Sequence, residues 1–239
     1  MRFMAQFELF AAFIIGFLSS YGLLLFTARG KEFPPAVERD VFLSFAIGAA
    51  LGVGTAVLRL AAVSSVATGA GANLSTTFLI LSPMLATLDV MPIYLYLNRK
   101  PFSGRPQAFY VSISLALGVA AMEITLKVFR NLSAEGFLSS YPGPLSLALF
   151  VLSSLLIRAA LGGDVGLSIT FPSSARAYVR PMLFMTIFNF LIAFYQVDWN
   201  LWPMTAITLV LSLIYLQRIG VRLSKLRRKM RLLEKKHYA

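Results

Sequence analysis

The stretch "FLILSPMLATLDVMPIYLYL", residues 78–97, decides the fold of this chain. It is mostly apolar, and about 20 such residues are what a helix needs to cross the hydrocarbon core of a bilayer. One acidic residue, Asp89, interrupts the run near its middle. A carboxylate at that depth costs roughly 2.5–3.5 kcal/mol on insertion scales, so it requires a partner, a hydrated cavity or a function.

The composition of the whole chain agrees with a membrane protein. Only 13% of the 239 residues are charged and 58% are hydrophobic, whereas a soluble domain averages about 25% charged residues. We predict an all-α integral membrane protein, in which residues 1–217 form a bundle of about seven transmembrane helices and residues 218–239 form a basic amphipathic cytoplasmic helix. The predicted spans are 3–27, 41–58, 73–97, 108–129, 145–162, 181–197 and 201–216.

Several kinds of chemistry are excluded by residue type. The chain has no cysteine, so it has no disulfide, thiolate metal site or cysteine nucleophile. Its one histidine, His237, stands two residues before the last residue. Histidine-ligated haem or zinc inside the membrane and serine–histidine triads are therefore excluded. We expect no cofactor and no metal. Scarce asparagine and glutamine, together with the lack of cysteine, suggest a hot habitat.

The distribution of basic residues predicts the orientation. With the C-terminus inside, the inner segments carry 17 Lys and Arg residues, and the outer side carries four. We therefore expect a multi-pass protein of the cell membrane with the N-terminus outside and the C-terminus in the cytoplasm. The four outer residues are Arg2, Arg59, Lys127 and Arg130. Two Asn-x-Ser sequons, at Asn73 and Asn131, fall on the same outer side.

The C-terminal segment carries much of the positive charge. Nine of the 22 basic residues lie between Arg218 and Lys236. The favoured interpretation is a helix that lies on the inner leaflet and binds anionic lipid. Apolar residues recur in it at spacings of four and three, which also allows a seam for a partner helix. Nucleic acid is the least favoured partner. The apolar positions are Ile219, Leu223, Leu226, Met230 and Leu233.

Two glycines of the second span, Gly48 and Gly52, share one helix face and mark a candidate interface. Glycines four residues apart allow another helix backbone to approach closely. Packing within the bundle is favoured over a dimer interface.

Four charged residues fall inside predicted spans. Glu8 lies within the first turns of its helix, and we expect it to reach the outer interface. Asp89 and Glu123 are the deeper candidates for catalysis, on an antiparallel hairpin that places their carboxyls on facing surfaces about two helical turns apart. Arg158 lies about four residues from the inner end of its span, so its side chain either reaches water or pairs with Asp89. Structural pairing, an ion or proton relay and a catalytic carboxylate all remain open.

The order of these features resembles the PrsW-type intramembrane proteases, which are related to the CAAX-processing proteases. The resemblance runs from about Tyr21 to Arg222. It rests on a charged, proline-bearing loop "TARGKEFPPAVERD", the second helix "FLSFAIGAALG", a glycine-rich turn "ATGAGANLS" and a basic final helix. The family's paired glutamates would fall within "LSPMLATLDVMPIYLYL", and "ALGVAAMEI" is similar to its fourth-helix motif.

The departures from the family pattern bear on activity. The paired-glutamate position reads Leu88-Asp89, so one carboxylate is missing and the other is shorter. Glu123 matches the fourth-helix glutamate, but Asn189 stands where a histidine is expected, and we treat Asn189 and Arg158 as candidate binding residues. Peptide hydrolysis needs an activated water and a proton donor for the leaving amine. The resemblance therefore implies the fold and argues against the activity.

We accordingly expect a non-catalytic, pseudoprotease-like bundle that binds a membrane-protein partner or serves as an accessory subunit of a membrane complex. Two alternatives stay open. One is a divergent intramembrane protease that uses Asp89 and Glu123, and the other is a channel or carrier for ions or solutes.

Overall fold

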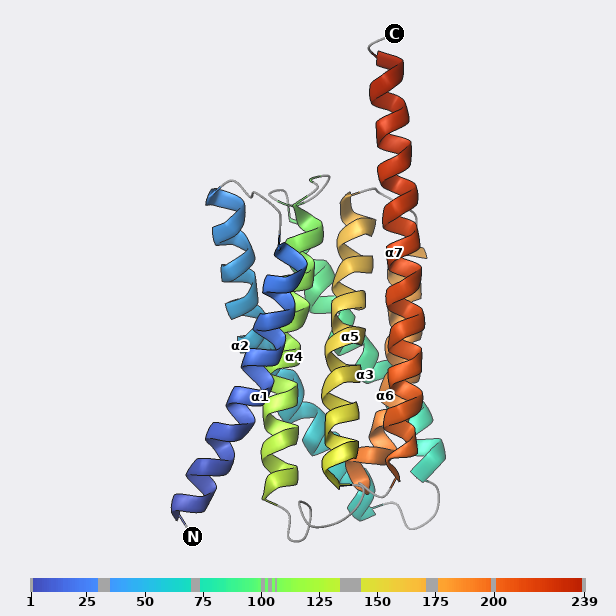
Figure 1. The fold of residues 1–239 in the computed structure, drawn as a ribbon. Coiled ribbons are helices and arrows are strands. Elements are labelled where there is room, and N and C mark those ends of the chain that lie inside the picture. Colours follow the sequence, from blue (N-terminus) through green and yellow to red (C-terminus); the bar gives the residue numbers. More distant parts are fainter. Residues whose placement is uncertain are drawn as a thin grey trace.

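The structure, a computed structural model, describes residues 2–29, 35–69, 74–99, 102, 105, 107–133, 143–170, 176–198 and 201–237. Within these residues the chain is a bundle of seven helices, and each helix is long and apolar enough to cross a membrane (Figure 1). The predicted all-α membrane fold is confirmed. The helices are α1 (Arg2–Ala28), α2 (Pro35–Gly69), α3 (Leu74–Leu97), α4 (Ala108–Leu132), α5 (Gly143–Thr170), α6 (Arg176–Val197) and α7 (Pro203–His237).

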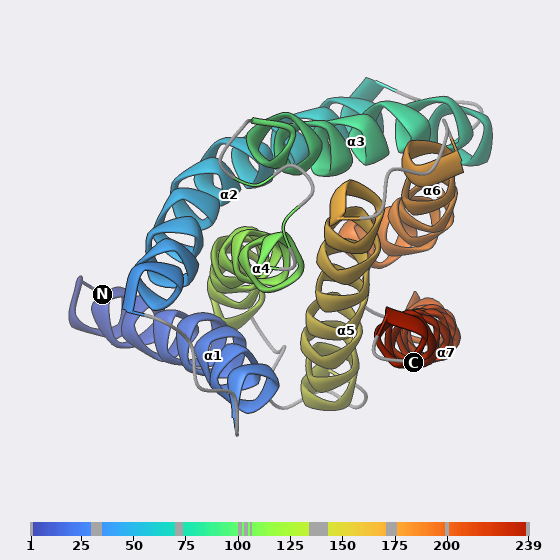
Figure 2. The same ribbon diagram turned by 90° about the horizontal axis from the view of Figure 1, so that it is seen from above.

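Helices α4 and α5 form the centre of the bundle. Seen from above, they lie inside an arc made by the other five helices (Figure 2). Helix α4 packs against α1, α2 and α5, while α5 packs against α4 and α7, and α3 packs mainly against α6. Most of the residues of α4 and α5 are buried, whereas large apolar side chains of the outer helices are exposed. Exposed apolar side chains on an outer helix are what lipid contact requires.

Close packing between α2 and α4 depends on glycine. A Cβ atom at Gly48 would collide with the carbonyl oxygen of Leu115, and one at Gly118 would collide with that of Phe45. At Gly52 the same atom would come within 2.8 Å of the Val119 carbonyl oxygen. The glycine face predicted from "GAALG" is therefore filled by α4 of the same chain.

Two predicted spans end too early. The second span was expected to stop at Leu58 and the fifth at Gly162, but α2 continues to Gly69 and α5 to Thr170. In both cases the charged residue read as the start of a loop, Arg59 or Asp164, is buried within the helix. A charge that finds its counter-charge inside the bundle does not end a span.

The expected boundary between a membrane domain and a tail is not a break in the helix. Helix α7 runs continuously from Pro203 to His237, across residues 217 and 218. Ile219 is buried next to Gly163 of α5, and Leu223 packs against the same core. The first two residues of the apolar seam thus belong to the bundle.

Candidate functional site: a buried ion-pair network

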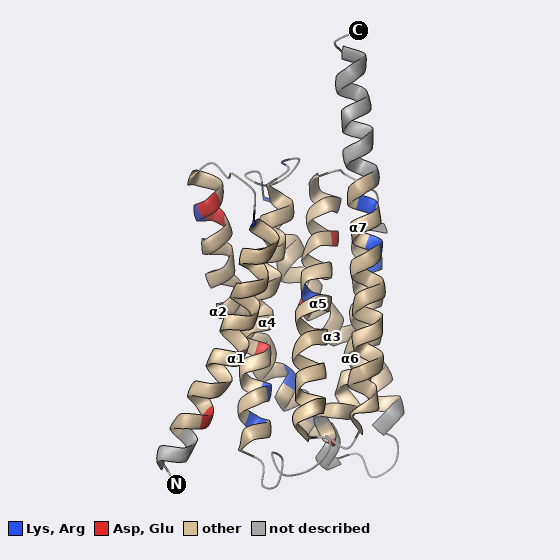
Figure 3. Ribbon diagram, viewed as in Figure 1, with Lys and Arg blue, Asp and Glu red and all other residues tan. Residues whose placement is uncertain are grey.

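A network of four charged side chains lies in the interior, and each comes from a different helix. Asp89 is on α3 and Glu123 is on α4, while α2 and α5 contribute one arginine each. The arginines are Arg59 and Arg158. All four residues are at most 5% exposed. Figure 3 shows charged segments at mid-height in the bundle as well as toward its two ends.

Each arginine binds both acids. Arg158 Nη2 donates to Asp89 Oδ1 at 2.8 Å and to Glu123 Oε2 at 2.6 Å. Arg59 Nη2 donates to the two Asp89 oxygens at 2.9 and 2.7 Å, and its Nη1 donates to Glu123 Oε1. All four carboxylate oxygens therefore accept hydrogen bonds from guanidinium groups. Such charge-assisted bonds are about twice as strong as neutral ones.

Asn189 on α6 completes the network. Its Nδ2 donates to Asp89 Oδ2 at 2.9 Å, so the residue that stands at the expected histidine position touches the candidate carboxylate. Within this network three buried atoms have no hydrogen-bond partner among the described residues, namely Arg158 Nε, Arg158 Nη1 and Asn189 Oδ1. At these atoms the hydrogen-bonding capacity of the network is not used by the described protein groups.

The sequence analysis named four of the five members of this network, Asp89, Glu123, Arg158 and Asn189, and the structure brings them together. The pairing of Arg158 with Asp89, one of two expected alternatives, is present. Arg59 was wrongly assigned to the outer loop. The available signal that the helix continues was the lack of proline and glycine in residues 59–68, which follow the apolar run.

The expected geometry of the two acids was also wrong. Asp89 and Glu123 do not lie two turns apart on a facing hairpin, because one Arg158 nitrogen bonds to both. Helix α3 is inclined relative to α4, which is seen nearly end-on in Figure 2. The two helices also make little direct contact. The acids meet through arginines of α2 and α5 rather than across an α3–α4 interface.

Space beside the network is small. A cavity of about 10 Å³ is lined by residues of α2 and α4, among them Arg59, Glu123 and Lys127. A volume of this size is close to the minimum that one water molecule occupies. Lys127 is 4% exposed, and its Nζ lies 4.8 Å from the centre of the Tyr195 ring. Among the described residues no carboxylate lies within ion-pair distance of it.

A second charged cluster, which the sequence analysis missed, surrounds Asp164 on α5. Arg180 of α6 donates to both carboxylate oxygens, with Nε at 2.6 Å from Oδ2. Arg222 Nη1 of α7 lies 2.6 Å from Oδ1, and Tyr215 Oη donates to Oδ2 at 3.0 Å. Asp164 itself is fully buried. The segment "GGDVGLSIT" resembled a loop because its glycines and its aspartate were read as breakers.

Other predicted residues have local roles. Glu8 on α1 is half-buried and accepts a hydrogen bond from Ser133 Oγ, just after α4, at 2.8 Å. Asn131 is buried in α4, and its Nδ2 donates to Tyr195 Oη at 3.1 Å, so it is not placed as a glycan acceptor. Lys127, which was counted on the outer side and falls within the predicted span 108–129, is inside α4. The sequon asparagine Asn73 lies outside the described residues.

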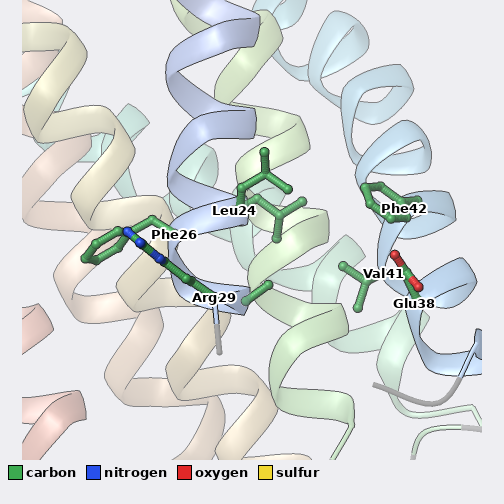
Figure 4. Close-up of a pocket in the computed structure, with 8 residues that line it drawn as sticks. Leu24, Phe26, Arg29, Glu38, Val41 and Phe42 are labelled. Atoms are coloured by element: carbon green, nitrogen blue, oxygen red, sulfur yellow. The ribbon is translucent and has the colours of Figure 1, made fainter. Parts of the chain in front are cut away.

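A groove of about 580 Å³ opens between α1 and α2 (Figure 4). Leu24 and Val41 lie deep in it, while Phe42 is partly exposed along its side. Two exposed charged residues, Arg29 and Glu38, line its end. Both helices rest on α4, and the groove is the space left where they diverge. Tyr21 on α1 lies near Phe42 and Phe45 on α2, at ring distances of 6.1 and 5.9 Å.

No family model, curated protein or solved structure matches the chain.

Proposed function

We propose that this chain is a non-catalytic multi-pass membrane protein whose PrsW-like bundle binds a partner in the membrane, as an accessory subunit or a stable binding protein. The observation that carries this proposal is that Arg59 and Arg158 each hold both Asp89 and Glu123. All four of their oxygens accept hydrogen bonds from Arg59 and Arg158. A general base has to present a lone pair to a water or a substrate proton. A carboxylate that two arginines hold can take a proton from water only by giving up part of these charge-assisted hydrogen bonds.

The surroundings of the acids support the same proposal. Hydrolysis of a peptide requires room for a substrate and an attacking water, and the cavity beside Glu123 measures about 10 Å³. A relay or carrier needs a hydrated path through the bundle, and the four charged residues of the network are themselves at most 5% exposed. Two acids and two arginines sum to zero charge, which suits a structural element in the hydrocarbon core.

The groove between α1 and α2 is the surface that we propose for the partner. Its walls are mostly apolar, and it lies between two helices at the edge of the bundle (Figures 2 and 4). In a membrane, such a recess suits a transmembrane helix of another protein, because van der Waals packing drives helix association there. Arg29 and Glu38 at its end could pair with an acidic or a basic residue of the partner, respectively.

Site-specific photocrosslinking in native membranes tests the partner. A photoreactive residue at Leu25 or Phe42 should give one discrete adduct with another membrane protein, while the same group at Val210 of α7 should give none. Leu25, Phe42 and Val210 are 48%, 39% and 57% exposed, so accessibility is matched. Adducts of equal yield at all three positions would show that the groove is not a binding site.

Absence of catalysis is tested separately. Purified wild-type protein should leave lipid-embedded peptide substrates intact at every pH between 5 and 9. Cleavage by the wild type that disappears in a folded Glu123→Gln variant would overturn the non-catalytic assignment and favour the divergent protease. Flux of ions or small solutes through reconstituted liposomes, lost in the same variant, would favour the channel or carrier.

A further inference from the structure

The Asp164 cluster holds more positive than negative charge. One buried carboxylate faces two arginines, Arg180 from α6 and Arg222 from α7. A third arginine, Arg218, lies one turn from Arg222 on α7, with its guanidinium carbon 5.9 Å from the centre of the Phe184 ring. Phe184 in turn lies one turn from Arg180 on α6. Residues four apart share a helix face, so the three guanidiniums gather along the α6–α7 seam.

These arginines are fixed in place and still accessible. The side chains of Arg180 and Arg222 are 40% and 23% exposed, although the carboxylate that holds them is fully buried. Arg222 uses Nη1 for both Asp164 and Ser168, and Arg180 uses Nε and Nη2 for Asp164. Among the residues that the structure describes, the other nitrogens of these two guanidiniums have no acceptor. Phe184 stacks on Tyr215 at a ring distance of 4.1 Å, which keeps α6 and α7 together beneath Arg218.

An excess of two positive charges inside membrane-spanning segments calls for an anion. All three arginines fall within the apolar spans Tyr178–Tyr195 and Pro203–Ser224. Asp164 is six residues before the end of α5 at Thr170, so the cluster lies near one end of the bundle, where lipid headgroups are in reach. Guanidinium forks match the oxygens of a phosphate, and basic pockets between transmembrane helices bind anionic headgroups.

We propose that Arg180, Arg218 and Arg222 form a binding site for the phosphate of an anionic phospholipid at the α6–α7 seam, preorganised by Asp164. The lipid's acyl chains then lie along the exposed apolar face of these two helices, to which Leu183 and Ile214 contribute. This site is independent of the partner surface on α1 and α2. It is also distinct from a non-specific attraction of the basic C-terminal residues to the membrane, because Arg180 belongs to α6.

The test is lipid titration of the full-length protein in a neutral detergent. Fluorescent phosphatidylglycerol should bind saturably, and phosphatidylcholine with the same chains should not compete. Arg218→Gln should weaken phosphatidylglycerol binding about fivefold, the value expected for one basic residue at an anionic surface. Arg218→Lys should restore most of the affinity. Arg218 has no bond to Asp164, so its substitution leaves the buried carboxylate paired.

The matched control is Arg99→Gln. Arg99 is exposed and lies over an aromatic ring, that of Tyr96, at 5.6 Å, just as Arg218 lies over Phe184. It should bind phosphatidylglycerol like the wild type. Equal losses in the two variants would show general surface attraction and overturn the proposal. Displacement by inorganic phosphate at millimolar concentration would assign the site to a free anion rather than a lipid, and would overturn it too.

Discussion

Arg59 of α2 and Arg158 of α5 donate hydrogen bonds to the same two carboxylates, those of Asp89 and Glu123. Each arginine is shared between both acids, so the network is a closed ring of alternating charge that joins four helices. Such a ring differs from two separate ion pairs. Loss of one acid leaves both arginines on the remaining carboxylate, and loss of one arginine leaves both acids on the remaining guanidinium.

Removal of one acid should therefore lower the free energy of unfolding strongly. Removal of one acid together with one arginine should lower it by less than the sum of the two single losses. We expect Asp89→Asn to lower the free energy of unfolding by about 3–5 kcal/mol, the usual effect of breaking a buried pair. Arg59→Gln should cost a similar amount. In the double variant the remaining Arg158 and Glu123 balance each other, so the two losses should not add.

Thermal unfolding in detergent measures these values, and Glu38→Gln is the control because its side chain is exposed. Strictly additive losses would contradict a shared ring.

Lys127 should respond in the opposite sense to its neighbours. It is buried with a cation–π contact to Tyr195 but no carboxylate among the described residues. The contact contributes about 0.5–2 kcal/mol, while burial of an unpaired ammonium costs more than that. Lys127→Met, which keeps the volume, should leave the melting temperature unchanged or raise it, whereas Arg59→Met should lower it. A lower melting temperature for Lys127→Met would mean that the ammonium has a stronger partner than Tyr195.

Packed and unpacked glycines of α2 should respond in opposite ways to substitution by alanine. A methyl group at Gly48 collides with the backbone of Leu115, while at Gly54 it meets nothing within 4 Å. Gly48→Ala should therefore destabilise the bundle by about 1–3 kcal/mol, and Gly54→Ala should stabilise it by up to about 1 kcal/mol through helix propensity. Both variants should have the wild-type oligomeric state in light scattering. A change of oligomeric state in Gly48→Ala alone would restore the dimer-interface interpretation.

Around Asp164 the loss of stability on substitution should increase with the number and charge of the hydrogen bonds removed. Tyr215→Phe removes one hydrogen bond at 3.0 Å and should cost about 1 kcal/mol. Asp164→Asn removes the counter-charge of Arg180 and Arg222 and should cost about 3–5 kcal/mol. Limited proteolysis after Thr170 should accelerate in Asp164→Asn but not in Tyr215→Phe. Equal acceleration in both would show that the tyrosine, rather than the charge, holds α6 and α7 to α5.

Sequence patterns predicted the helices well where apolar runs meet charged connections. Helix α3 ends at Leu97, as expected, because Asn98, Arg99 and Lys100 follow it. The sequence patterns failed where a charged residue is buried inside the bundle. Arg59 and Asp164 looked like loop residues because their partners lie on other helices, and a pattern along the chain does not reveal a neighbour 30 or 58 residues away. Asp89 was recognised as a site because it interrupts a long apolar run, and Asn189 only through the family resemblance.

The vertical positions of the acids were harder to predict. A count of residues from the helix ends treats helices as parallel rods, which put Asp89 and Glu123 about two turns apart. Helix α3 is inclined relative to α4 (Figure 2), and the two acids lie close enough for one Arg158 nitrogen to bond to both. Helix inclination is set by packing against neighbours rather than by the length of the apolar run, so it is not contained in the spacing of residues within one helix.

The distribution of the network over α2, α3, α4 and α5 has a consequence for biosynthesis. The charges enter the membrane in chain order, first Arg59, then Asp89, then Glu123 and last Arg158. After α4 has emerged from the ribosome, one arginine faces two acids, and the nascent chain carries an unmatched anion until α5 arrives. Asp164 then waits in the same way for Arg180 and Arg222. The four charges of the network are therefore balanced after α3, unbalanced by one negative charge after α4 and balanced again after α5, so a chain truncated after α4 holds an uncompensated charge in the membrane.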